Sequence, residues 1–174
     1  MLKEMLKKKQ KEKNIVEQIK NSYYHYTIVP NKSVGTFVFD TKIDTYLLGK
    51  IYEYYEPNDS YSGEGSYKFP ELGMTVFVDS KKLITTVICE QYLLFGNTNL
   101  IGQNMEILIQ KMDWQPNLIE KSWTNVNGKD QRQTVYDFDE LGLQIWVYRK
   151  KIVSVVCGNL NEIPNETGNY DNDM

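Results

Sequence analysis

The chain contains little of the chemistry on which most enzymes depend. Its 174 residues include two cysteines, Cys89 and Cys157, and one histidine, His25. Two cysteines without a secretory signal do not indicate a disulfide framework, so we interpret both as buried small apolar residues. A catalytic site that needs histidine would have to use His25, and no serine or cysteine between glycines offers a nucleophile to join it. We therefore expect no catalytic residue, no metal site and no cofactor.

Long apolar runs are also missing. No stretch of about 18 apolar residues, the length that spans a bilayer, occurs in the chain. The first 22 residues are instead Lys-rich, with apolar residues such as Leu2, Ile15 and Ile19 at helical spacing. Such a helix could touch acidic lipid, but its apolar stripe is thin and a solvated helix is the favoured interpretation. We expect a cytoplasmic protein that does not bind membranes.

Charge is distributed unevenly along the chain. The net charge is −3, but residues 1–22 hold seven Lys and three Glu, and the remaining 152 residues hold 13 basic and 20 acidic groups. The body of the protein is therefore acidic. An acidic body argues against nucleic acid as a direct ligand and is compatible with a basic protein partner.

The strongest pattern that is present is a segment that occurs twice. Tyr67–Val87 and Tyr136–Val156 align without a gap at a constant offset of 69 and are identical at nine of 21 positions. Both copies place Glu-Leu-Gly before two apolar stretches. We interpret the pattern as an internal duplication, and hence as a tandem repeat.

The repeat suggests a division into four parts: a Lys-rich N-terminal helix and lead-in (1–29), a first repeat (30–92), a second repeat (93–158) and an acidic tail (159–174). Thr41 and Asp44 fit a capping box for a short helix, and Asn104 fits the N-cap of a helix from Met105 to Met112. Asn127-Gly128 predicts a tight turn between two strands. We therefore predict an α+β fold, in which two tandem units of one helix and a four-stranded antiparallel sheet form one extended sheet with both helices on one face.

Alternation along the predicted strands defines two faces of this sheet. We expect corresponding strands at Met74–Val78 and Leu143–Tyr148. Their aliphatic residues point one way and should lie under the helices, namely Met74, Val76 and Val78 in the first copy and Leu143, Ile145 and Val147 in the second, whereas Trp146 and Tyr148 point the other way. The corresponding residue of the first copy is Phe77, and the register decides whether Tyr52, Tyr54 and Trp123 join it. An uncovered aromatic face is typical of a protein-binding surface, and the alternative is that the N-terminal helix covers it.

A known fold family shares this organisation. Ser33-Val-Gly-Thr-Phe-Val-Phe39 and Asn99-Leu-Ile-Gly102 precede the two helices, and Leu72-Gly73 and Leu141-Gly142 form paired turns. Over residues 30–158 the pattern resembles the β-lactamase-inhibitor-protein-like tandem-repeat fold and is similar to that of some bacterial toxin-immunity proteins. Secreted inhibitors of this kind carry signal peptides and disulfides that this chain lacks, so a cytosolic immunity protein fits better.

The resemblance implies an intracellular immunity protein, without enzymatic activity, that acts in bacterial competition. It would bind a cognate toxin, for example a basic nuclease domain, and block it with the sheet face and loops. The loop of residues 56–66, with Glu64, would be a specificity element. The predicted partner-binding residues are Tyr52, Tyr54, Phe77, Trp123, Trp146, Tyr148 and Glu64.

Two other functions stay open from the sequence. The chain could hold a small molecule or a lipid between sheet and helices, and a hydrophobic dye with a saturable internal site would favour this alternative. An enzyme that uses only Tyr, Asp and Glu is the least favoured alternative, because no catalytic motif is present.

Overall fold

The computed structural model describes residues 26–57 and 65–158. The predicted N-terminal helix, His25, Glu64 and the acidic tail lie outside the described residues, so those expectations stay predictions.

One large antiparallel sheet forms the framework of the molecule, as predicted. It has eight strands in the order β10-β11-β12-β13-β7-β6-β5-β4, so two four-stranded meanders meet at the β13–β7 pair. The strands are β4 (Glu53–Tyr55), β5 (Gly65–Phe69), β6 (Met74–Val78), β7 (Ile84–Cys89), β10 (Leu118–Val126), β11 (Lys129–Phe138), β12 (Leu143–Tyr148) and β13 (Lys151–Gly158). The turn between β10 and β11 is Asn127-Gly128, and both residues have positive φ, which confirms the predicted tight hairpin.

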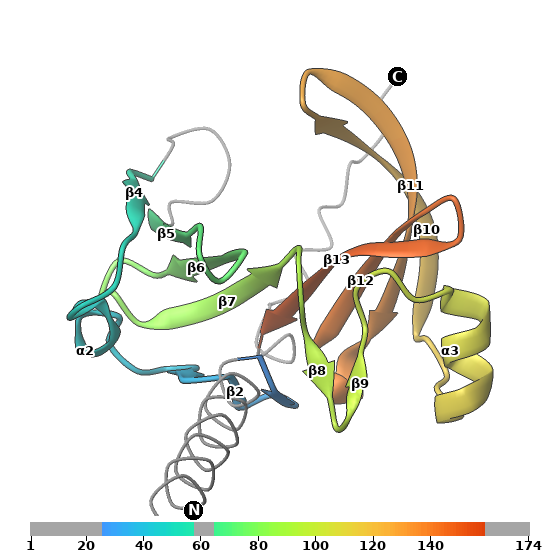
Figure 1. The fold of residues 1–174 in the computed structure, drawn as a ribbon, viewed down its shortest axis with the longest axis horizontal. Helices are drawn as coiled ribbons and strands as arrows, with labels where there is room; N and C mark the ends of the chain where they lie inside the picture. The colour runs from blue at the N-terminus through green and yellow to red at the C-terminus, as the bar shows by residue number, and fades with distance from the viewer. Residues whose placement is uncertain (1–25, 58–64, 159–174) are drawn as a thin grey trace, which may run out of the picture.

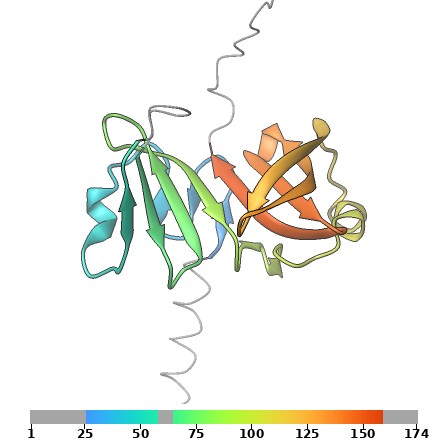
Figure 2. The ribbon, with the colours of Figure 1, turned by 90° about the horizontal axis from the view of Figure 1, so that it is seen from above.

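A second, thinner layer covers one face of this sheet (Figures 1 and 2). It contains a small sheet of β1 (Ile28–Val29), β2 (Ser33–Val34) and β3 (Phe37–Val38), and a hairpin of β8 (Leu94–Phe95) and β9 (Thr98–Asn99). A parallel bridge between Thr27 and Leu94 joins the two. The helices α2 (Asp44–Leu47) and α3 (Met105–Met112) lie toward the two ends of the layer, and a 3-10 turn, η1 (Asp139–Leu141), connects β11 to β12.

The predicted α+β class, with repeats of one helix plus a sheet, is therefore wrong. Strands dominate the described chain, and its two α-helices have only four and eight residues. The segments expected as simple lead-ins form hairpins, because Gly35 and Gly96 adopt the positive φ that their tight turns require. None of the helices in the described ranges has the length and hydrophobicity to cross a bilayer.

Only one of the two predicted helix caps is formed. The Asn104 side chain accepts hydrogen bonds from the backbone N–H groups of Glu106 and Ile107 at 3.0 and 3.2 Å, which confirms the predicted N-cap of α3. The Thr41 hydroxyl instead donates to the Val38 carbonyl at 2.7 Å, so the predicted capping box of α2 is not formed.

The core lies between the two layers. Met74, Val76 and Val78 of β6 alternate with half-buried residues, and so do Leu143, Ile145 and Val147 of β12, as predicted. The buried rows pack with the covering layer, which contributes Val34, Phe37, Leu93 and Leu100 among others. Each fully buried side chain of this size contributes about 1.5–3 kcal/mol. Cys89 and Cys157 are buried free thiols in the same core, as expected.

The β6–β7 and β12–β13 hairpins correspond closely, but not without a gap. The pairing register shifts after Phe77 in the first hairpin and after Trp146 in the second. Met74 pairs with Cys89, whereas Leu143 pairs with Cys157, so the second hairpin is one residue shorter. The offset of 69 therefore holds before the turn and becomes 68 after it. The duplication as an evolutionary event stays a prediction.

Candidate functional site

The face of the large sheet opposite the covering layer is the candidate site, and we call it the outer face. On β6, β7, β12 and β13 the strand registers assign to it residues that are half-buried rather than buried. Its central rows, on β6, β7, β13 and β12, are Thr75, Phe77, Thr86, Ile88, Ser154, Val156, Gln144 and Trp146. No helix or small sheet of the described chain lies on this face (Figure 1). All eight side chains are uncharged.

Charged residues surround these rows. Charged residues of both signs have the parity of the outer face: the acidic ones are Glu53, Glu90, Glu120 and Asp137, and the basic ones are Lys68 on β5, Lys129 on β11 and Lys151 on β13. The central depletion of charge, with aromatic residues and a polar border, is the composition found at the cores of protein interfaces.

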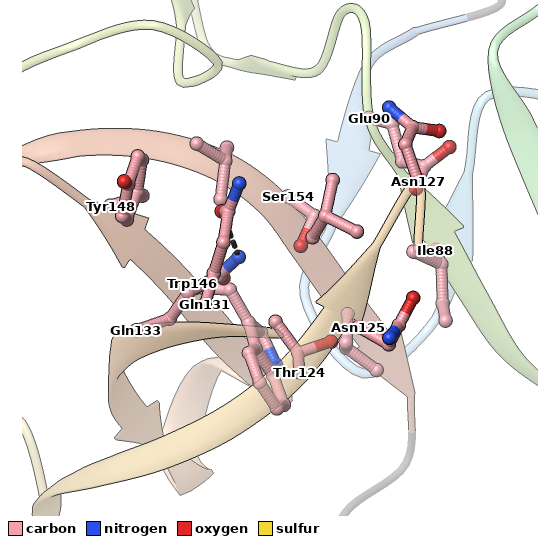
Figure 3. Close-up of a pocket in the computed structure, with 13 residues that line it drawn as sticks. Ile88, Glu90, Thr124, Asn125, Asn127, Gln131, Gln133, Trp146, Tyr148 and Ser154 are labelled. Atoms are coloured by element: carbon pink, nitrogen blue, oxygen red, sulfur yellow. Dashed lines mark hydrogen bonds between the residues drawn. The ribbon is translucent and has the colours of Figure 1, made fainter. Parts of the chain in front are cut away.

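A hollow of about 610 Å³ opens on the second half of the outer face (Figure 3). Its floor is formed by β7, β12 and β13, and one wall by the β10–β11 hairpin, which rises from the sheet on this side (Figure 1). The lining residues are Ile88, Glu90, Thr124, Asn125, Val126, Asn127, Gln131, Gln133, Trp146, Tyr148, Val153, Ser154 and Val156.

Local hydrogen bonds position the polar side chains of the hollow. The Trp146 indole Nε1 donates to Gln144 Oε1 of the same strand at 2.8 Å, so the ring is held along β12. Gln133 is buried although it is polar, and its Nε2 donates a long hydrogen bond to Gln131 Oε1 at 3.4 Å (Figure 3). The hollow therefore combines a fixed aromatic ring with side-chain amides.

The turn that forms the wall is also fixed. Asn125 Oδ1 accepts from the Gly128 backbone N–H at 2.9 Å, and Asn125 Nδ2 donates to Asp130 at 3.0 Å. These bonds hold the two-residue turn closed and keep Asn127 at the rim of the hollow.

The structure divides the predicted contact residues between the two faces. Phe77, Trp146 and Tyr148 have outer-face parity, and Trp146 and Tyr148 line the hollow. Phe77 lies on the other half of the sheet and does not line it.

Three predicted residues do not belong to the outer face, because the register points them the other way. Tyr54 pairs with Tyr67, which is buried in the core, and Tyr52 lies two residues before it with the same parity. Trp123 pairs with Arg132, which is the neighbour of Gln133 on β11 and therefore points to the opposite face of the sheet. The Trp123 side chain is 68% exposed. The register therefore leaves Tyr52, Tyr54 and Trp123 off the outer face, and a role of these three residues in partner binding stays a prediction.

The sequence prediction also missed residues of the hollow. Gln133, Ile88 and Val156 lie on strands that were identified correctly, but their polar or aliphatic character gave no functional signal. Residues that pair with one another across neighbouring strands lie on the same face of the sheet. Starting from Trp146 on β12 and following the alternation along β11, β13 and β7 would therefore have identified them.

Within the described ranges, no three His, Cys, Asp or Glu side chains are grouped as a metal site requires.

Comparison with known proteins found no matching family model, no matching curated protein and no matching solved structure.

Proposed function

We propose that this chain is a non-catalytic binding protein that recognises another protein through its outer face. The observation that carries the proposal is the uncharged central surface, with Phe77, Trp146 and Tyr148, on the face that the covering layer leaves free. Half-exposed aromatic rings held in place lose little conformational entropy on binding, and Trp and Tyr are enriched among the residues that dominate binding energy.

The dimensions of the face suit such a partner. Eight strands about 4.8 Å apart and about 17 Å long present about 600 Å² in flat projection, before the relief of side chains is added. A stable protein interface buries about 800 Å² per partner. With the relief of its side chains added, the face is therefore comparable in size to one side of a stable interface.

Within this class we propose an immunity or inhibitor protein that blocks a cognate toxin. The acidic body of residues 23–174 supports a basic partner, such as a nuclease domain, because opposite charge accelerates encounter. Occlusion by a preformed sheet needs no chemistry on the side of the inhibitor.

A matched pair of tryptophan variants tests the proposal. Wild type, Trp146→Ser and Trp123→Ser are immobilised as bait for extracts of the source organism, and captured proteins are then purified and titrated by calorimetry. We expect Trp146→Ser to weaken binding by about 30-fold or more, as loss of a central tryptophan does. Trp123→Ser, on the opposite face, should bind like wild type. Equal affinity of all three proteins for every captured partner would contradict the proposal.

The volume of the hollow supports a second candidate, a protein that binds a small molecule. Ligand pockets have volumes of about 300–1,000 Å³, and the hollow of about 610 Å³ lies within this range. Its position on the outer face differs from the predicted site between sheet and helices. Saturable binding of a hydrophobic dye that Ser154→Trp abolishes by filling the hollow, while protein capture is absent, would favour this candidate.

A further inference from the structure

Three tyrosines gather at the other end of the sheet, on the face opposite the outer face. Tyr52 and Tyr54 come from the edge strand β4 and its approach, and Tyr67 from β5. The ring centroids of Tyr54 and Tyr67 are 4.8 Å apart, and those of Tyr52 and Tyr67 are 5.6 Å apart. The Tyr54 ring also lies against Gly65, where a Cβ would be 2.9 Å from the Tyr54 hydroxyl oxygen. The tyrosines are therefore packed in fixed positions.

A hollow of about 480 Å³ opens beside these rings, toward α2. Besides the three tyrosines, its lining contains Asp44 and Leu47 of α2, Glu56 after β4, and Lys82 of the β6–β7 turn. Tyr52 and Tyr54 keep 40% and 44% of their surface exposed, although large aromatic side chains are usually covered. We call this group of residues the tyrosine hollow.

The tyrosine hollow has a net negative charge, because Asp44 and Glu56 line it against the single positive charge of Lys82. Burial raises the pKa of Tyr67 above its ordinary value, and the nearby Tyr54, Asp44, Tyr52 and Glu56 raise it further. Of these neighbours, only the two carboxylates supply the negative charge that favours a cation in the space beside the rings.

Lys82 already supplies one positive charge at the rim. Its Nζ lies 3.8 Å from Asp44 Oδ1, and both side chains are more than half exposed. A pair with this separation and exposure is weak. Lys82 therefore neutralises Asp44 only weakly, and Glu56 has no ion pair in the described part of the chain.

We propose that the tyrosine hollow binds an organic cation, either a quaternary ammonium group or the guanidinium group of an arginine side chain. Tyrosine ring faces attract such cations through the ring quadrupole, and weakly hydrated cations are the ones that exchange water for aromatic surface most readily. Asp44 and Glu56 supply the opposite charge, and Lys82 acts as a built-in competitor. The site lies on the opposite face from the protein-binding surface, so it stands independently of the proposed function.

Choline and its neutral isostere 3,3-dimethylbutan-1-ol provide a direct test, since they share a shape and differ in charge. The full-length protein is titrated with each compound, and with N-acetylarginine amide, while amide chemical shifts are followed by NMR. We expect saturable shifts for at least one cation at the amides of the tyrosine hollow, and weaker binding at higher salt. The neutral alcohol should cause no saturable shift. The two cations show whether the site prefers an ammonium or a guanidinium group.

Charge variants complete the test and give changes of opposite sign. Lys82→Met should strengthen cation binding about two- to fivefold, because it removes the competitor, whereas Lys81→Met on the same turn should leave affinity unchanged. Tyr52→Leu, which keeps an apolar body, should weaken binding about two- to fivefold, and Asp44→Asn with Glu56→Gln should weaken it further. Equal shifts from choline and the alcohol, no saturable shift from either cation, or identical affinity for Lys82→Met and Lys81→Met would overturn the proposal.

Discussion

The β11–β12 connection provides a sharp test of the architecture that supports the hollow. Gly142 ends η1 with φ +60°, and a Cβ built there would lie 2.2 Å from the Gly158 carbonyl oxygen and 2.2 Å from Asn31 Oδ1. The Gly158 N–H donates to the Gly142 carbonyl at 3.1 Å, and Asn31 Nδ2 donates to the Glu140 carbonyl at 2.8 Å. The Gly158 backbone therefore has little freedom to move away from a methyl group.

The expected loss for Gly142→Ala follows from two contributions. Left-handed backbone costs an alanine about 1–2 kcal/mol. The clash with backbone adds at least as much, so the free energy of unfolding should fall by at least about 2–4 kcal/mol, toward the range of severe single substitutions. Gly128→Ala is the matched control, because it has φ +78° but nothing within 4 Å of the added Cβ. It should lose only about 1–2 kcal/mol.

Urea denaturation followed by circular dichroism measures both variants against wild type, with the slope m checked for constancy. Gly142→Ala should have a clearly lower midpoint than Gly128→Ala. If the two variants lose the same free energy, Gly142 does not approach Gly158 and Asn31 as described, and the connection between β11 and β12 is incorrect.

Three further predictions address the helix cap, the buried tyrosine and the thiols. Asn104→Ala should lower the free energy of unfolding by about 0.5–2 kcal/mol in a urea titration, because two N–H groups of α3 lose their acceptor, and Gln110→Ala on the exposed surface of α3 should change it by less than about 0.5 kcal/mol. The pKa of Tyr67 is raised above its ordinary value of 10.0, so above pH 10 the folded chain holds more protons than the unfolded chain, and the free energy of unfolding falls as pH rises. Tyr67→Phe should reduce this fall, and an identical dependence of the free energy of unfolding on pH in both proteins would contradict the assignment. Burial raises the pKa of the Cys157 thiol well above its ordinary value, with Cys89 adding to the effect, and the Cys89 side chain is itself buried. Neither thiol should therefore react with a disulfide reagent at pH 8 until the protein is unfolded, and rapid labelling of the native protein would show that the seam between β7 and β13 is open.

Much of the large sheet could be predicted from the sequence, because its signals are local. Alternating apolar residues identified β6 and β12 with their correct bounds, and Asn127-Gly128 identified the β10–β11 turn. The Asn104 cap placed the start of α3 correctly. Each of these features depends on neighbouring residues in the chain.

The covering layer could not be predicted in the same way. Strands β1, β2, β3, β8 and β9 have two residues each, too few for alternation to appear. Their formation depends on contacts with distant segments, such as the hydrogen bond from the Leu94 N–H of β8 to the Tyr26 carbonyl. The fold class was therefore wrong although most of the long strands were right.

The candidate site was predicted only in part for a related reason. A strand's face follows from alternation, but which faces of different strands coincide depends on the pairing register. Trp146 and Tyr148 share one strand and were grouped correctly, whereas Tyr54 and Trp123 lie on the two edge strands and face the other side.

Fluorine NMR of the full-length chain labelled with 5-fluorotryptophan tests the central claim most directly. The three resonances report Trp114 in the core, Trp123 on the opposite face and Trp146 on the outer face. A soluble gadolinium chelate should broaden Trp123 and Trp146 in the free protein, and a captured partner should protect Trp146 while Trp123 stays accessible. Protection of Trp146 in the free protein, or of Trp123 alone in the complex, would contradict an uncovered outer face that binds the partner.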